Sequence, residues 1–133
     1  MTRYLLDTNH SSQLVHHERS PIWDRLDALS RKQYGLCWPS IGELWFMMLN
    51  SAKVERNRAR LNSLLPQFSI WRFEDEEAFQ FALLRVELRK AGRPIPAVDM
   101  MIAAIARANN LVLVTADRHF DLISGLKVEN WIA

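Results

Sequence analysis

The sequence predicts an α/β fold: a single domain over residues 1–133, with a central parallel sheet of about five strands flanked by helices. Two observations predict this class. Short apolar runs typical of buried strands alternate along the chain with longer helical segments. The run 111–115 has no polar alternation, which is typical of a central parallel strand covered on both faces. With 133 residues, 49% of them hydrophobic, the chain has the size and composition of one globular domain.

Five segments have strand character. The first begins at Arg3 and stops abruptly at Asp7, and the fourth ends at Thr115. We expect these two to be neighbours at the centre of the sheet, because ligands of open parallel sheets bind where such strands end. The remaining predicted strands are 35–38, which is closed by Pro39, 68–73, which alternates with period two, and 127–131, at an edge.

Helices are predicted between these strands from caps and apolar spacing. Thr8 and Asn9 can cap a helix through residue 15, and Ser20 with Pro21 begins another. Ser40 and Glu43 have the spacing of a capping box at the start of a helix over 40–49. Further helices are predicted from residue 53 to about 65, over 74–91 with an acidic first turn that complements the helix dipole, and over 99–109.

Cysteine and histidine offer no metal site of their own. The single cysteine, Cys37, excludes an internal disulfide framework and a cysteine-based zinc site, and we expect it to be a buried thiol. His10, His16 and His17 do not converge on one helical face with an acidic partner, so we expect surface histidines. The sequence has no apolar run of membrane-spanning length and no signal-peptide pattern, which favours a cytoplasmic protein.

Four carboxylates stand where strands end or helices begin. Asp7 and Asp117 follow predicted strands, and Glu43 and Asp99 lie at the starts of predicted helices. Three of them also have a structural explanation: a capping box for Glu43, a cap or dipole partner for Asp99, and a turn for Asp117. Because all four are expected at the same edge of the sheet, we predict one pocket for a divalent metal ion.

The charge distribution suits a polyanionic substrate. If four of the 15 acidic residues surround a metal, 11 remain against 17 Lys and Arg residues, and the outer surface is basic. A solvated surface with a slight positive balance is the alternative. The candidate phosphate contacts are Lys53, Arg56, Arg58, Arg60, Arg93 and Arg118.

The predicted helix over 40–49 is apolar around its circumference, so something must cover its second face. A larger core is one explanation. A protein partner or a second subunit is the other, with Trp45, Phe46, Met48 and Leu49 as its contact surface.

Taken in order, these motifs resemble the PIN domain, and more closely the VapC-type ribonuclease toxins of prokaryotic toxin–antitoxin systems. The segments that carry the resemblance are 6–9 (LDTN), the Glu43 helix, 96–104 (PAVDMMIAA) and 114–120 (VTADRHF). The resemblance implies Mg²⁺- or Mn²⁺-dependent RNA cleavage, a homodimer, and inhibition by a cognate VapB antitoxin. It also implies that Asp7, Glu43, Asp99 and Asp117 are the acidic site residues and that Thr115 supplies a supporting hydroxyl.

This chain departs from the family pattern after the fourth strand. Many members carry Asn where this chain has Asp117, and many have an Asp-Phe pair where it has His119-Phe120. That departure leaves Asp121 outside the predicted site.

The predicted mechanism is in-line hydrolysis of an RNA phosphodiester by a metal-activated water, with Asp7 and Asp99 as the most direct ligands. The main alternative is a non-catalytic RNA-binding or scaffolding module of the same fold, and DNA flap cleavage is a weaker one. A phospho-accepting receiver domain needs paired acids after the first strand, and an aspartyl-phosphate phosphatase needs an Asp where this chain has Asn9. The sequence does not name the RNA that is cleaved.

Overall fold

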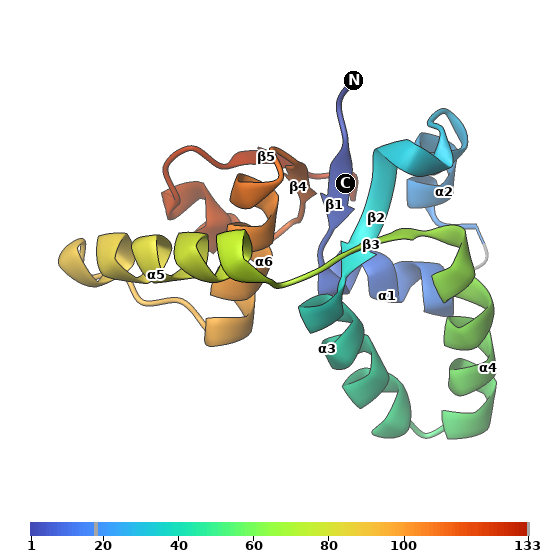
Figure 1. Ribbon diagram of the computed structural model, residues 1–133. Helices are drawn as coiled ribbons and strands as arrows, with labels where there is room; N and C mark the ends of the chain where they lie inside the picture. Colours follow the sequence, from blue (N-terminus) through green and yellow to red (C-terminus); the bar gives the residue numbers. More distant parts are fainter. Residues whose placement is uncertain (18, 133) are drawn as a thin grey trace.

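The structure, a computed structural model, describes residues 1–17 and 19–132. Within this part of the chain, five parallel strands form one sheet in the order β3-β2-β1-β4-β5 (Figure 1). They are β1 (Tyr4–Leu6), β2 (Tyr34–Cys37), β3 (Ser69–Trp71), β4 (Val112–Val114) and β5 (Lys127–Glu129). The predicted α/β class is confirmed, and β1 and β4 are neighbours at the centre, as the sequence predicts.

Helices cover both faces of this sheet. Figure 1 shows α5 and α6 on one side and α1, α2 and α4 on the other. The helices are α1 (Thr8–His16), α2 (Pro21–Asp27), α3 (Trp38–Leu49), α4 (Val54–Leu64), α5 (Asp75–Lys90) and α6 (Ala97–Ala108). Short 3-10 turns lie at Arg31–Gln33 (η1), Leu65–Gln67 (η2) and Arg118–Leu122 (η3). No helix in the described ranges is both long enough and apolar enough to span a membrane.

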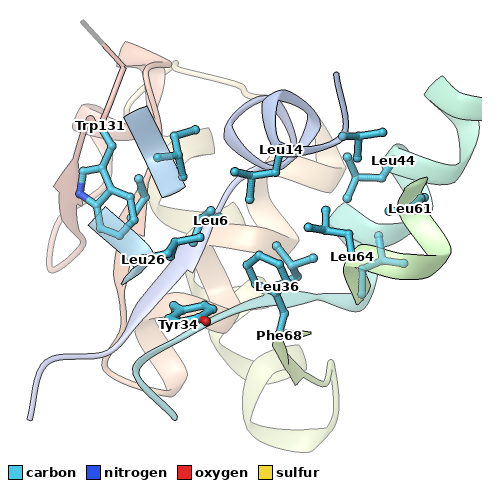
Figure 2. Close-up of a cluster of buried hydrophobic side chains, with 14 of the residues drawn as sticks. Leu6, Leu14, Leu26, Tyr34, Leu36, Leu44, Leu61, Leu64, Phe68 and Trp131 are labelled. Atoms are coloured by element: carbon cyan, nitrogen blue, oxygen red, sulfur yellow. The ribbon is translucent and has the colours of Figure 1, made fainter. Parts of the chain in front are cut away.

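Two apolar clusters lie on the two faces. Successive strand side chains point to opposite sides, so β1 contributes Leu6 to one cluster and Leu5 to the other. Figure 2 shows the first cluster, in which Leu6 packs with residues of α1, α3 and α4. The second cluster joins Leu5 to α5 and α6. Because apolar side chains and helices cover both faces of the sheet, a polar site is expected at the carboxyl ends of the strands.

The start of α3 differs from the prediction. The helix begins at Trp38, so the predicted strand over 35–38 was one residue too long at its end. The Ser40 hydroxyl donates to the Cys37 carbonyl (2.9 Å) and accepts from the Cys37 amide (3.4 Å), which makes Cys37 the N-cap. Cys37 is buried, as expected, and burial raises the pKa of its thiol.

The start of α5 agrees with the prediction that the acidic block serves the helix. Glu74 is the N-cap, and its amide donates to the Glu77 carboxylate at 2.9 Å. Three acidic residues occupy the first turn and two basic residues the last, as the helix dipole favours.

Candidate active site

A pocket of about 610 Å³ opens at the carboxyl ends of β1 and β4. Four carboxylates line it, and they are contributed by the start of α1, by α3, by α6 and by the segment after β4: Asp7, Glu43, Asp99 and Asp117. Its other lining residues are Thr8, Asn9, Pro39, Gly42, Phe46, Met47, Val98, Ile102 and Phe120. The structure therefore brings the four acidic residues of the predicted site to one cavity with an apolar wall.

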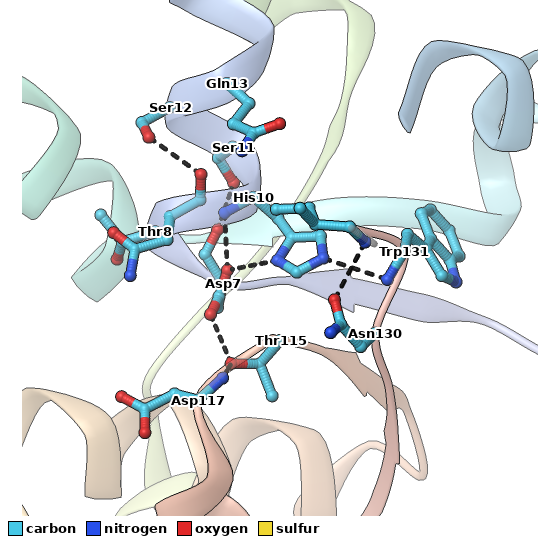
Figure 3. A network of polar contacts seen from close by, with 12 residues as sticks. Asp7, Thr8, His10, Ser11, Ser12, Gln13, Thr115, Asp117, Asn130 and Trp131 are labelled. Carbon is cyan, nitrogen blue, oxygen red and sulfur yellow. Dashed lines mark hydrogen bonds and ion pairs between the residues drawn. The ribbon is translucent and has the colours of Figure 1, made fainter. Parts of the chain in front are cut away.

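Asp7 is buried and held by donors from two elements (Figure 3). It is the N-cap of α1, and its Oδ1 accepts from the His10 amide at 2.8 Å. The His10 ring nitrogen Nδ1 lies 3.2 Å from the same oxygen. Oδ2 accepts from the Thr115 hydroxyl, which in turn accepts from the Asp117 amide at 3.0 Å. The carboxylate is thus fixed between α1 and the end of β4.

Glu43 does not cap its helix, and the predicted capping box with Ser40 was wrong. Because α3 begins at Trp38, Ser40 is bonded to Cys37 and Glu43 falls in the second helical turn. There its Oε1 accepts from the Thr8 hydroxyl at 2.5 Å. Glu43 is therefore oriented by the start of α1, next to Asp7, and is free of any capping role.

Asp99 and Asp117 both face the imidazole of His119. The His119 Nδ1 lies 3.0 Å from Asp117 Oδ1, and Nε2 lies 3.0 Å from Asp99 Oδ2. Nε2 is also a buried nitrogen for which the described residues provide no hydrogen bond. Asp117 also caps η3 by accepting from the His119 amide at 3.3 Å. The three ligand-type atoms lie within 4.8 Å of one another.

Asp99 lies in a cluster that contains more acidic than basic side chains. Burial raises the pKa of the Asp99 carboxyl above its ordinary value. The charge of His119 opposes that shift, whereas the Glu43 and Asp117 carboxylates add to it. A cation bound among these groups relieves the repulsion, which is the behaviour expected of a metal pocket.

His10 is the site residue that the sequence analysis missed. The prediction of a surface residue was wrong, because its side chain is 0% exposed, whereas His16 and His17 are exposed as expected. Its Nε2 accepts from the Trp131 backbone amide at 3.2 Å. The available signal was its position three residues after Asp7, inside the first turn of the helix that Asp7 caps.

The candidate phosphate contacts do not line the pocket. Arg93, Lys53, Arg56 and Arg58 are exposed away from its wall. Arg60 donates to the Val15 carbonyl at 3.1 Å, so it also joins α4 to α1. Arg118 is exposed near Asp117, and its Nε lies 3.8 Å from Asp121 Oδ2.

The apolar surface predicted on α3 is smaller than expected. Met48 is fully buried and Trp45 packs against the first cluster, so both belong to the core and not to a contact surface. Phe46 and Leu49 are 68% and 51% exposed. Phe46 also lies at the edge of the acidic pocket.

With this geometry established, comparison with known proteins identifies the family. The PIN domain model matches residues 4–126. The chain belongs to the PIN domain family. Ribonuclease VapC2 of Haemophilus influenzae is 32% identical over 99% of this chain and 100% of that protein, which places the chain among the VapC-type toxins.

Two further relatives extend the comparison. The tRNA(fMet)-specific endonuclease VapC of Shigella flexneri is 27% identical over 98% of this chain and 99% of that protein. The crystal structure of VapBC2 from Rickettsia felis, bound to a DNA fragment from their promoter, has a TM-score of 0.91. It is 29% identical and covers 98% of this chain and 99% of that one. The predicted PIN fold and VapC-type family are confirmed.

Proposed function

We propose that this chain, acting as one domain over residues 1–133, is an endoribonuclease that hydrolyses RNA phosphodiester bonds with a divalent metal ion. The observation that carries the proposal is the convergence of Asp7, Glu43, Asp99 and Asp117 on one pocket of a VapC-type PIN domain. Relatives named as ribonucleases support the reaction class.

The donor set fits Mg²⁺ or Mn²⁺. All four carboxylates offer oxygen, which these hard cations prefer. Burial, with a smaller contribution from the Glu43 and Asp117 carboxylates, raises the pKa of Asp99, and a bound cation would favour its charged form. Asp7 and Asp99 would be the most direct ligands, and Glu43 and Asp117 would complete the site. When bound, the ion would supply Lewis acidity that activates water and offsets charge on the phosphate.

The protein's own contribution is orientation. The Thr115 hydroxyl donates to Asp7 Oδ2 and accepts from the Asp117 amide, so it links the segment after β1 to the segment after β4. Thr8 holds Glu43 against the start of α1. The apolar wall includes the buried Phe120 and the exposed Phe46, and Phe46 offers surface to a nucleotide base.

The same proposal includes partners and location. Solved VapBC complexes cover nearly all of this chain, which supports inhibition by a cognate VapB-type antitoxin. Phe46 and Leu49 are candidate contacts with that antitoxin or with a second subunit of a homodimer. Since its proposed substrate is cellular RNA, we place the protein in the cytoplasm. The name of the Shigella relative makes initiator transfer RNA the first substrate to test.

The deciding experiment is cleavage of total cellular RNA by purified, antitoxin-free protein, with Mg²⁺ or Mn²⁺ and with EDTA, beside Asp99→Asn. We expect discrete metal-dependent fragments that the variant does not produce, and sequencing their ends identifies the target. Matched RNA and DNA oligonucleotides separate a ribonuclease from a flap nuclease. Tight Mn²⁺ binding without cleavage of any RNA would favour a non-catalytic binding module.

A further inference from the structure

We propose that His10 is a positioning residue that orients the Asp7 carboxylate for metal binding, and that the C-terminal segment at Trp131 sets its orientation. The inference rests on the proposed metal-dependent function. Nothing in the family match assigns this role, and His10 does not line the pocket. It acts on the site only through Asp7.

The hydrogen bonds fix the tautomer of the ring. The Trp131 backbone amide can only donate, and it lies 3.2 Å from His10 Nε2, so Nε2 is the acceptor. The proton of a neutral ring is therefore on Nδ1, which faces Asp7 Oδ1 at 3.2 Å. Figure 3 shows this chain of contacts from Trp131 through the imidazole to Asp7. With its side chain fully buried, the ring has no competing water.

These contacts restrain rotation of the Asp7 carboxylate. Oδ1 is held by the amide and the ring of His10, both from the first turn of α1. Oδ2 is held by the hydroxyl of Thr115, the residue that follows β4. Ligands restrained in this way lose less freedom when metal binds, and partners that orient metal ligands typically contribute about 10–100-fold in affinity.

The Trp131 side chain is fixed by several contacts, so its backbone amide has a defined position from which to orient His10. Its ring packs on Tyr4 of β1, with centroids 5.2 Å apart, and lies 5.7 Å from the Arg25 guanidinium. Its indole Nε1 donates to Glu129 at 3.1 Å. The contacts tie the last strand and α2 to the residue that orients Asp7.

The two ring nitrogens have separate partners, so two substitutions separate their roles. His10→Asn places an amide nitrogen near the position of Nδ1, which keeps the donor to Asp7 and loses the acceptor for Trp131. His10→Gln places its amide near the position of Nε2, which keeps a partner for Trp131 and loses the donor to Asp7. His16→Asn, at an exposed position on the same helix, is the matched control.

The test is Mn²⁺ affinity by calorimetry, with thermal unfolding in EDTA measured on the same full-length samples. We expect His10→Gln to bind Mn²⁺ about 10–100-fold more weakly. His10→Asn should stay within about threefold of the unsubstituted protein, even if it melts lower than His10→Gln. The Mn²⁺ concentration that half-saturates RNA cleavage should shift in parallel.

Two results would overturn the inference: equal Mn²⁺ affinity in both variants, or losses of affinity that simply follow the melting temperatures. The second result would reduce His10 to a structural residue. Failure of the unsubstituted protein to bind Mn²⁺ or to cleave RNA would instead contradict the proposed function, so the two failures are distinguishable.

Discussion

The two halves of the candidate active site are constructed differently. The Asp7 side chain is 8% exposed, and its partners are a backbone amide, the His10 imidazole and a hydroxyl. The side chains of Asp99 and Asp117 are 23% and 42% exposed, and the His119 imidazole lies between them. We call Asp7 and its hydrogen-bond partners the organised half of the site. We call Asp99 and Asp117, whose carboxylates lie at ion-pair distance from His119, the charge-held half.

The difference follows from where each residue lies. Asp7 directly follows the central strand β1, so helix α1 and the residue after β4 supply its hydrogen-bond partners while it still lines the pocket. Asp99 lies in the first turn of α6 and Asp117 in the segment after β4, and the two meet only across the pocket. We infer that Asp7 is oriented before metal binds, whereas the Asp99 half depends on a cation to offset its repulsion.

The largest expected effect comes from Asp7→Asn, which tests the organised half. Asn retains an acceptor for the His10 amide and remains a good N-cap, so the melting temperature should fall by only a few degrees. Cleavage should fall by at least about 100-fold, because a ligand charge is lost. Cleavage rates with circular-dichroism melts check both parts. Cleavage at the unsubstituted rate would remove Asp7 from the metal site.

The sequence predicted the parts of this site whose signals are local. The apolar runs before Asp7 and Asp117 predicted the central strands, and the order of strands and helices predicted that the acids share one edge. The burial of His10 had no local signal, because its second partner, Trp131, lies 121 residues away. The start of α3 was misjudged because Ser40 had two possible capping partners, and Cys37 was the one it used.

Asp99→Asn tests the charge-held half through pH. In the folded and the unfolded protein alike, the Asp99 carboxyl is protonated below its unfolded pKa near 3.8. Because its pKa is raised in the folded protein, the folded state keeps this proton to a higher pH than the unfolded state does. The free energy of unfolding therefore falls as pH rises from the unfolded pKa of Asp99 to its folded pKa, and this loss of stability persists at neutral pH. In EDTA at pH 7, Asp99→Asn should melt slightly higher than the unsubstituted protein, and the gain should shrink as pH falls towards 3.8.

Melts with added Mn²⁺ complete that experiment. The unsubstituted protein should gain melting temperature from Mn²⁺, and Asp99→Asn should lose most of that gain. A variant that melts lower at every pH would mean that the carboxylate is a net stabiliser through His119, which would contradict the comparison between the two halves.

The smallest expected effect is that of His119→Gln, which removes the imidazole between the two carboxylates but keeps a polar side chain. Without it, the pKa of Asp99 should rise further, since His119 lowers it, and the metal-free protein at pH 6 should melt about 2–4 °C lower. His17→Gln, at an exposed position, is the matched control. If His119 only offsets the acids, Mn²⁺ replaces its charge, and the variant gains more from Mn²⁺ than the unsubstituted protein. A smaller gain would instead make the imidazole a metal ligand, and the charge-held half would then be part of a mixed nitrogen and oxygen site.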